Sequence, residues 1–215
     1  MPSLELSVQE VREALTRVSV ANISDAMHGF GTLRKIRAID ENAKLVGPAQ
    51  TVSARSGDWA DVAEAVDTAH EGEVLVIDAG GAGPAVWGEL ATHSALQRRL
   101  AGVVVYGAVR DILEIKKLGF PVFCRSVVPD ALRPKGKGEI GRAVTIAGVA
   151  ILPGDWIIGD SSGVVCIPQS SVADVVPRAM RILEKEDAIR ERIDQGSTLW
   201  REMGSYWRDE LSKIE

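Results

Sequence analysis

Three short apolar runs, at residues 73–78, 102–106 and 121–124, are the feature that most constrains the fold of this chain. Sequence of helical composition at 87–100 and 111–118 separates these runs. Apolar runs of this length, without polar alternation, are typical of strands that are buried on both faces of a sheet. The succession of strand, helix and strand predicts parallel strands joined by right-handed crossovers.

The second half of the chain follows a different pattern. Strands are predicted at 143–152, 155–159 and 163–167, and only short turns separate them, which is typical of antiparallel hairpins. A further strand, with a bend or an edge position, is predicted at 44–54, because a Gly-Pro pair interrupts a β-branched run there. The combination predicts an α/β fold in which a mixed sheet contains βαβ units and antiparallel hairpins.

Helical segments are predicted towards both ends of the chain. Ser7 followed by Glu10 is the pattern of a capping box, and apolar residues recur at helical spacing over 7–19. A second short helix is expected to be capped by Asn22 or Ser24. Further helices are predicted at 59–70 and 171–195, the latter followed by a helical or frayed tail.

The length and composition indicate one globular unit. The chain has 215 residues, of which 46% are hydrophobic and 26% charged, close to the average of globular domains. We find no internal repeat and no low-complexity linker. This predicts a single domain over 1–215, with helical N- and C-terminal extensions.

Charge, cysteine content and the first residues of the chain exclude several classes of function. The formal net charge is −5 and the acidic excess is dispersed, which disfavours a surface for nucleic acid. Cys124 and Cys166 have no metal-binding or disulfide spacing and are expected to be buried thiols in a reducing compartment. No signal-peptide pattern and no run of about 20 apolar residues is present. We expect a cytoplasmic protein without nucleic-acid or membrane partners.

Arg110 and Asp111 are the strongest candidates for chemistry. They follow a predicted buried strand directly, in the run Gly107-Ala-Val-Arg110-Asp111, and α/β sheets bind ligands beyond the carboxyl ends of their strands. A surface ion pair, or an aspartate that caps the next helix, is the competing interpretation of this motif alone.

A second candidate is the predicted helix start at 85–91, which follows a glycine-rich loop. Free backbone N–H groups at a helix start bind carboxylates, and Gly88 would let a ligand approach the backbone closely. The competing interpretation is an ordinary helix start. Taken together, the N–H groups near Leu90 and Ala91 and the Arg110 guanidinium could clamp one carboxylate.

Carboxylates beside such a clamp suggest a metal. Asp111 and Glu89 could supply oxygen ligands to Mg²⁺, which prefers one or two carboxylates together with water and substrate oxygens. A cation chelated by a pyruvate-like group stabilises the enolate that forms when the adjacent carbon–carbon bond breaks. Retro-aldol cleavage and decarboxylation of a β-keto acid both produce that enolate.

Five motifs occur in order along the chain. They are Ile23-Ser24-Asp25-Ala26, Val46-Gly47-Pro48-Ala49, Gly88-Glu89-Leu90-Ala91, Gly107-Ala-Val-Arg110-Asp111 and Pro153-Gly154-Asp155 with Gly159-Asp160 and Gly163-Val-Val. This ordered set, between about residues 18 and 196, resembles the RraA-like family. That family includes the 4-hydroxy-4-methyl-2-oxoglutarate aldolases and the regulator of ribonuclease activity.

The resemblance implies a swivelling β/β/α fold, assembly into trimers or hexamers with sites between subunits, and dependence on Mg²⁺ or Mn²⁺. It also implies that substrate is bound by the segment Gly88, Glu89, Leu90 and Ala91. Arg110 matches the substrate arginine and Asp111 the metal ligand, and oxaloacetate decarboxylation is a common additional activity. The chain departs from the family pattern at Tyr106, where a small polar or acidic residue is usual, so substrate preference stays open.

Other groups of residues have competing interpretations. The acidic stretch formed by Glu184, Glu186, Asp187 and Glu191 is expected to be a solvated helix face, and the alternative is an acid donated across a subunit boundary. The three histidines, His28, His70 and His93, are expected to be ordinary, partly exposed residues, and His93 is the one that follows Gly88–Ala91 closely in the sequence. We therefore predict a metal-dependent lyase that releases pyruvate, and the alternative is a non-catalytic regulator that binds a ribonuclease-like partner through an acidic surface.

Overall fold

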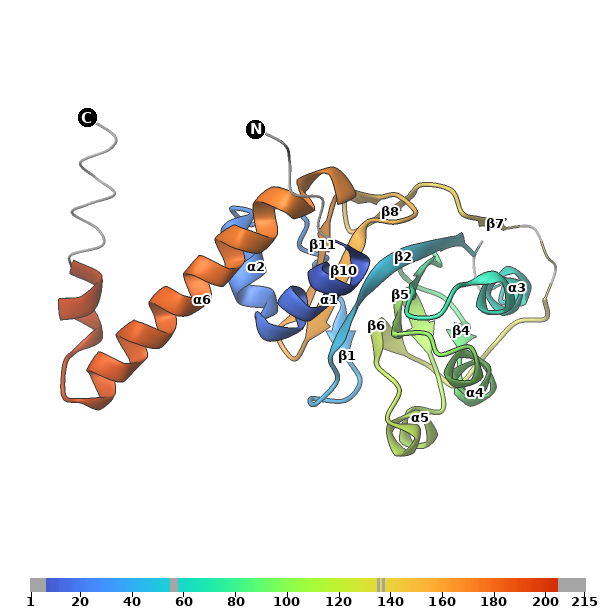
Figure 1. Ribbon diagram of the computed structural model, residues 1–215. Helices are drawn as coiled ribbons and strands as arrows, with labels where there is room; N and C mark the ends of the chain where they lie inside the picture. Colours follow the sequence, from blue (N-terminus) through green and yellow to red (C-terminus); the bar gives the residue numbers. More distant parts are fainter. Residues whose placement is uncertain (1–6, 55–57, 135, 137, 205–215) are drawn as a thin grey trace.

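The computed structural model describes residues 7–54, 58–134, 136 and 138–204 (Figure 1). Its elements are, in order, α1 (Val8–Arg17), α2 (Val20–Ala26), β1 (Arg37–Ala38), β2 (Leu45–Ser53), α3 (Ala60–Thr68), β3 (Val74–Asp78), β4 (Ala85–Trp87), α4 (Glu89–Gln97), β5 (Gly102–Val109), α5 (Ile112–Leu118), β6 (Val122–Val127), β7 (Glu139–Ile140), β8 (Val144–Ile146), β9 (Val149–Ile151), β10 (Trp156–Asp160), β11 (Gly163–Ile167), the 3-10 helix η2 (Gln169–Ser171) and α6 (Val172–Asp194). Residues 199–204 are also helical. In the ranges described, no helix combines the length and apolar character that crossing a bilayer requires.

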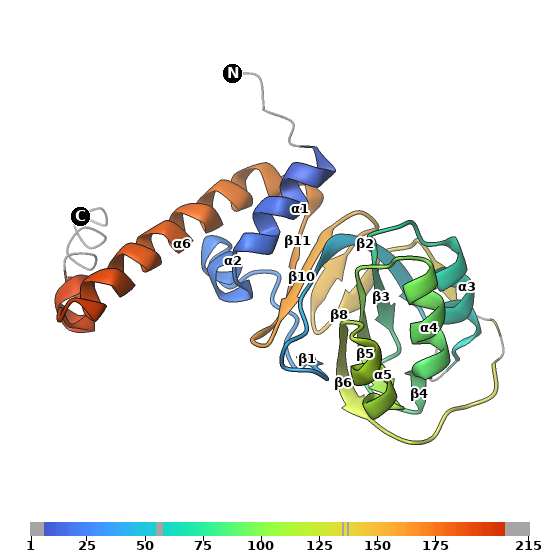
Figure 2. The same ribbon diagram turned by 60° about the horizontal axis from the view of Figure 1, so that its bottom comes forward.

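The main sheet is mixed, with strand order β1-β6-β5-β3-β2-β10-β11. The four central strands β6, β5, β3 and β2 pair with one another in parallel. At the two ends of the series the pairing is antiparallel, between β1 and β6, between β2 and β10, and between β10 and β11. Figure 2 shows α3, α4 and α5 side by side over one face of the parallel part, where they enclose the largest apolar cluster. The predicted α/β fold with a mixed sheet, of the swivelling β/β/α type, is confirmed.

The strand β2 lies inside the sheet, so the predicted edge position was wrong. Its first residues, Leu45 to Pro48, pair with β10, and the residues from Ala49 to Ser53 pair with parallel β3. Pro48 has no N–H to donate and stands directly before the residue at which pairing with β3 begins. The Gly-Pro pair therefore marks a change of neighbours along one strand.

The predicted strand at 143–152 is a hairpin of two strands, β8 and β9, paired antiparallel. Ala147 and Gly148, between them, both have positive φ (51° and 88°), as a two-residue hairpin turn of type I′ requires. Apolar side chains of this hairpin, Val144, Ile146 and Ile151, pack with Val76 and Val104 of the main sheet. The hairpin thus covers the sheet face opposite to the helices.

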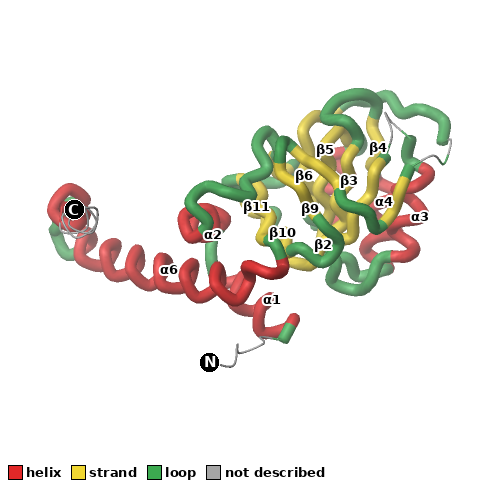
Figure 3. The backbone as a smooth tube through the Cα atoms, turned by 90° about the horizontal axis from the view of Figure 1, so that it is seen from above, coloured by secondary structure: helices red, strands yellow, loops and turns green. Residues whose placement is uncertain are grey.

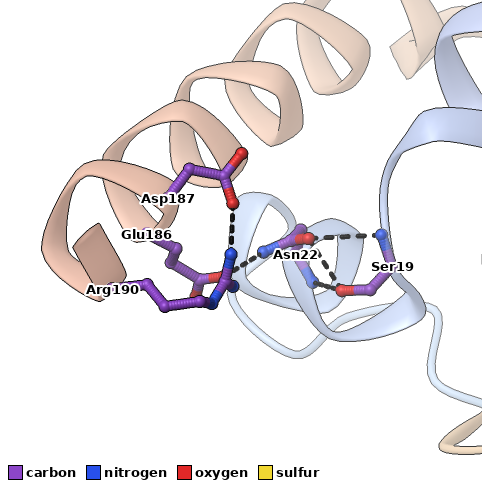
Figure 4. A network of polar contacts seen from close by, with 5 residues as sticks. All are labelled: Ser19, Asn22, Glu186, Asp187 and Arg190. Carbon is purple, nitrogen blue, oxygen red and sulfur yellow. Dashed lines mark hydrogen bonds and ion pairs between the residues drawn. The ribbon is translucent and has the colours of Figure 1, made fainter. Parts of the chain in front are cut away.

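At the N-terminus the capping box of Ser7 and Glu10 is confirmed, and the second helix begins earlier than predicted. Ser19, rather than Asn22 or Ser24, is the N-cap of α2, and Asn22 completes a capping box with it. The Asn22 side-chain amide also donates to Glu186 of α6 at 2.7 Å (Figure 4). Asparagine replaces the usual Glu or Gln of the box, so the standard pattern did not reveal this cap.

The helices α1, α2 and α6 pack together at the end of the sheet that carries β10 and β11, around a second apolar cluster. Viewed from above, α6 extends away from the sheet, on the side opposite to α3 and α4 (Figure 3). The residues beyond 204 and before 7, which belong to the predicted terminal extensions, lie outside the described part of the chain.

Candidate active site

A cavity of about 300 Å³ lies between α3, the start of α4 and the junction of β5 with α5. Its lining includes every residue that the sequence indicated for substrate and metal, namely Gly88, Glu89, Leu90, Ala91, Arg110 and Asp111. Two segments about 20 residues apart in the chain therefore meet at one site.

A short strand that the sequence did not predict brings the two segments together. Residues 85–87, which were expected to start the helix, form β4, and β4 pairs in parallel with the end of β5. Trp87 lies beside Val109 in this register, and the Arg110 N–H donates to the Trp87 carbonyl at 3.0 Å. Because both strands end at the same edge, Gly88 and Arg110 become neighbours.

The first turn of α4 provides N–H groups without helical acceptors. The first backbone bond of the helix runs from the Thr92 N–H to the Gly88 carbonyl at 3.1 Å. The N–H groups of Leu90 and Ala91 precede that bond, so the helix itself offers them no carbonyl. A carboxylate in the cavity could accept from these groups, and the positive end of the helix dipole would favour its charge.

Buried hydrogen bonds hold the start of α4 against β4. The indole N–H of Trp87 donates to the Thr92 hydroxyl at 2.9 Å, and that hydroxyl donates to the Gly88 carbonyl at 3.0 Å. Trp87 and Thr92 are both buried. Sequence reasoning missed this pair, because a spacing of five residues across a strand–helix junction matches no helical pattern.

Asp111 occupies the N-cap position of α5 but does not cap it. Its side chain makes no bond to that helix, and its backbone is left-handed, with φ 57° and ψ 36°. One carboxylate oxygen, Oδ2, instead accepts from the Glu89 N–H at 3.1 Å and lies 3.5 Å from Nε of Arg110. A left-handed backbone costs a residue with a side chain about 1–2 kcal/mol, and such strain is common at functional sites. The capping interpretation of this motif was therefore wrong.

Gly88 leaves space at the centre of the site. A Cβ atom at this position would lie 2.6 Å from Oδ2 of Asp111 and 3.2 Å from Cγ of Arg110. Its φ of −161° is extended, and any residue can adopt it. The glycine is therefore required for the close approach of Asp111 rather than for its backbone conformation.

His93 lies beside the candidate site, whereas Tyr106 lies away from it. His93 lies one turn beyond Glu89, and its Nε2 is 3.6 Å from Oε1 of Glu89. Tyr106 does not line the cavity. It packs on the other face of β5, where Arg125 donates to its hydroxyl at 3.1 Å and stacks over its ring at 5.4 Å. The departure from the family pattern thus lies across the sheet from the candidate site.

The acidic residues of α6 lie away from the cavity of their own chain. Glu186 accepts from Asn22, and Asp187 forms an ion pair with Arg190 (Figure 4). None of the described residues of α6 lines the cavity. An acid donated to another subunit stays a prediction.

The donor set limits the kind of metal that the site could hold. In the described part of the chain, no three His, Cys, Asp or Glu side chains come together as a metal cage would require. Zinc sites need three or four such ligands, whereas Mg²⁺ is held by one or two carboxylates with water and substrate completing its shell. Asp111, which lines the cavity with a partly exposed side chain, fits the second type.

Comparison with known proteins agrees with the fold. The family model described as RraA-like, Aldolase/RraA, matches residues 20–166. A protein of Halalkalibacterium halodurans, provisionally named 4-hydroxy-4-methyl-2-oxoglutarate aldolase, is 41% identical over 172 residues, which cover 79% of this chain and 81% of that protein.

Two solved structures share the architecture over most of the chain. An uncharacterized protein from Pseudomonas syringae pv. tomato is 30% identical, with a TM-score of 0.81 and coverage of 90% of this chain and 96% of that chain. Streptomyces coelicolor RraAS2, described as an unusual member of the RNase ES inhibitor RraA protein family, is 26% identical, with a TM-score of 0.72 and coverage of 86% and 98%. From the family match, the fold and the ordered motifs, this chain belongs to the RraA-like family.

Proposed function

We propose that this protein is a divalent-metal-dependent carbon–carbon lyase that cleaves a 4-hydroxy-2-oxo acid into pyruvate and a second carbonyl compound. One observation supports this most strongly: Arg110, Asp111 and the first-turn N–H groups of α4 line the same cavity. The provisional name of the Halalkalibacterium halodurans relative points to the same chemistry.

The substrate carboxylate would be held from two sides. Arg110 offers a guanidinium whose side chain is 44% exposed, so it can reach a ligand without leaving its position beside Asp111. The N–H groups of Leu90 and Ala91 offer two further donors. Charge-assisted hydrogen bonds of this kind are about twice as strong as neutral ones and fix the orientation of a planar carboxylate.

Asp111 would hold Mg²⁺ or Mn²⁺, with Glu89 as a second carboxylate where its contact with His93 is released. When bound, the cation would act as a Lewis acid beside the 2-oxo group and offset the negative charge that develops there. Gly88 contributes by letting the side chains of Asp111 and Arg110 approach the start of α4 closely.

The reaction balances without a redox partner. The bond between C3 and C4 breaks, and its electron pair stays on C3. The proton of the C4 hydroxyl is removed and C4 becomes an aldehyde or ketone, while C3 accepts a proton to become the methyl group of pyruvate. Loss of CO₂ from oxaloacetate leaves the same three-carbon enolate, so decarboxylation is proposed as a secondary activity. The catalytic unit is proposed to be a homotrimer or hexamer.

A second function is favoured by the relation to RraA proteins and by the net charge of −5. In this alternative the protein is a non-catalytic regulator that binds a ribonuclease-like partner through an acidic surface. A binding module has no chemical need for the arrangement of Arg110, Asp111 and Gly88. Isolation of a stable partner together with absent lyase activity would reverse the ranking.

The test is pyruvate release from a panel of 4-hydroxy-2-oxo acids and oxaloacetate, with Mg²⁺ or Mn²⁺ and with excess chelator. We expect activity only with metal, and a loss of about 10³-fold or more in Asp111→Ala, on the scale of removing a principal electrostatic group. Asp174→Ala, at an exposed position of α6, is the matched control and should keep wild-type activity. Full activity in Asp111→Ala or in chelator would rule the mechanism out.

A further inference from the structure

A second cavity, of about 500 Å³, lies at the end of the sheet that carries β10 and β11 (Figure 1). It is bounded by the start of α2, by the segment at residues 32–37 and by the turn between β10 and β11. Its volume is within the range of cavities that hold small molecules. It shares no lining residue with the cavity of Arg110 and Asp111, so the chemistry proposed above gives it no role.

Three cationic side chains line this second cavity, and all of them come from one short segment. They are Arg34, Lys35 and Arg37, and each is exposed to solvent. None of the three forms an ion pair with another residue in the part of the chain that the structure describes. Like charges gathered around one cavity repel one another, and a bound anion would offset that repulsion.

The segment that carries the cations is anchored at both ends, so the charges are held in place before any ligand binds. Leu33 and Ile36 alternate with the cations and are 1% and 0% exposed. The Leu33 N–H donates to the Val164 carbonyl at 2.9 Å, and Arg37 pairs with Cys124 in the ladder between β1 and β6. Groups that are fixed in advance lose less conformational entropy when a ligand binds.

The guanidinium of Arg37 lies close to the turn between β10 and β11. Its Nη1 donates to the Ile36 carbonyl at 3.1 Å, and a Cβ atom on Gly163 would lie 3.6 Å from it. The other N–H donors of this group bond to no acceptor among the described residues. The hydroxyls of Ser24 and Thr32, which lie 3.4 Å apart, belong to residues that also line the cavity. Guanidinium and hydroxyl groups together suit the oxygens of a phosphate.

The carboxylate of the adjoining turn, Asp160, is already bonded to the backbone. Its Oδ2 accepts from the Val20 N–H at 2.9 Å, and its Oδ1 accepts from the Ser162 N–H at 2.8 Å. These bonds tie the start of α2 to the turn between β10 and β11, which are two of the walls of the cavity. Asp160 itself is not part of the lining. It therefore fixes the shape of the cavity without supplying a counter-ion to the cations.

We propose that this cavity binds a diphosphate group, either free or as part of a nucleotide. One phosphoryl group carries a charge of about −1.5 to −2 at pH 7, so two linked groups match three cations better than a single carboxylate does. The planar fork of an arginine also fits pairs of phosphate oxygens. The proposal adds a ligand site to the molecule and does not depend on the lyase function.

Isothermal titration calorimetry of the full chain with pyrophosphate tests the proposal directly. At fixed ionic strength we expect saturable binding that is tighter than the binding of sulfate by about 10-fold or more, because pyrophosphate carries the larger charge. The double variant Arg34→Ser and Arg37→Ser should bind about 100-fold more weakly, since it loses two charge-assisted contacts. Both side chains are exposed, so thermal melts should show a folded variant. Absence of saturable binding to the wild type would overturn the proposal.

Two control variants show whether the anion binds in this cavity. Lys116→Ser combined with Lys117→Ser removes the same charge from an exposed part of α5, outside the lining, and should leave the affinity within about 2-fold at fixed ionic strength. Arg110→Gln removes the cation of the other cavity and should also leave the affinity unchanged. Equal weakening in the lysine variant, or loss of binding in Arg110→Gln alone, would overturn the proposal.

Two further measurements identify what occupies the cavity. A titration with ADP separates the two sources of the diphosphate group, because tighter binding than pyrophosphate indicates a nucleotide and weaker binding indicates free diphosphate. Sedimentation velocity of the wild type and of the Arg34→Ser and Arg37→Ser variant tests whether a second copy of the chain covers the cavity. A change in assembly mass in that variant, together with no binding of pyrophosphate to the wild type, would assign the cations to a contact between subunits and overturn the proposal.

Discussion

Two aspartates at two turns of this molecule differ in their burial and in the number of backbone N–H groups that bond to their carboxylates. Asp155, in the turn before β10, is 5% exposed, and its carboxylate accepts from the N–H groups of Leu152 at 2.8 Å and Gln169 at 3.0 Å. Asp111, in the junction before α5, has a side chain that is 38% exposed and accepts from one backbone N–H.

The difference separates a structural carboxylate from one that can bind a ligand. Both oxygens of Asp155 are used to close a turn and to anchor the segment that leads to α6. In Asp111, Oδ1 has no hydrogen-bond partner among the described residues, and the backbone is strained. A side chain whose bonding capacity is saturated by its own chain stabilises the fold, whereas an incompletely bonded one at a cavity is available for chemistry.

The largest effect expected to test this contrast is on the stability of a variant in which Asp155 is replaced. Asp155→Ala should lower the free energy of unfolding by about 2–3 kcal/mol, because it leaves two partly buried N–H groups without an acceptor. Urea denaturation measures this change. Asp155→Asn keeps one acceptor oxygen and should lose less. If the Asp155→Ala variant lost under about 1 kcal/mol, the distinction between the two turns would fail.

At the turn that contains Asp111, the expected loss is in substrate binding. Arg110→Gln should raise KM for the keto acid about 30-fold, because the substrate carboxylate loses its charged partner. The free energy of unfolding should change by less than about 0.5 kcal/mol, since the side chain is partly exposed. Arg110→Lys, which keeps the charge without the planar fork, should recover part of the affinity. A large fall in the free energy of unfolding of Arg110→Gln, with KM unchanged, would contradict the comparison.

Two glycines show a similar contrast, because a methyl group added at one would meet the candidate site and at the other the core. In Gly88→Ala the new methyl group meets Asp111 at 2.6 Å, and kcat/KM should fall about 10-fold with stability almost unchanged. In Gly159→Ala it meets the Phe123 ring at 2.8 Å inside the core, and unfolding free energy should fall by about 1–3 kcal/mol. Parallel activity assays and thermal melts distinguish the two. The reverse pattern would contradict the assignment of Gly88 to the site.

The smallest expected effect is on the chemical reactivity of the two buried thiols. Burial raises the pKa of Cys124 to about 11, and burial followed by the Asp155 carboxylate raises the pKa of Cys166 to about 12. Both shifts favour the neutral thiol, so at pH 8 almost no thiolate exists in the folded protein. Iodoacetamide should modify neither residue on the timescale on which it modifies both in urea. Rapid modification of Cys166 in the native state would show that the region around Asp155 opens easily.

Local sequence predicted much of the secondary structure correctly. The capping box of Ser7 and Glu10 and the three buried parallel strands were recognised because a few adjacent residues determine them. The same holds for Arg110 and Asp111, which follow a strand end. The helix at 59–70 was predicted correctly, but a helix face that packs in the core and one that lines a cavity have the same periodicity.

What the sequence determined by itself is therefore the order of elements, the covered faces of the helices and the residue types available for chemistry, since propensity and periodicity act over a few neighbouring residues. Only the tertiary structure decided that β4 lies beside β5, that Asp111 turns away from its own helix, and that α3 contributes to the lining of the cavity. These features depend on pairing and packing between segments distant in the chain, and such contacts leave no fixed spacing in the sequence.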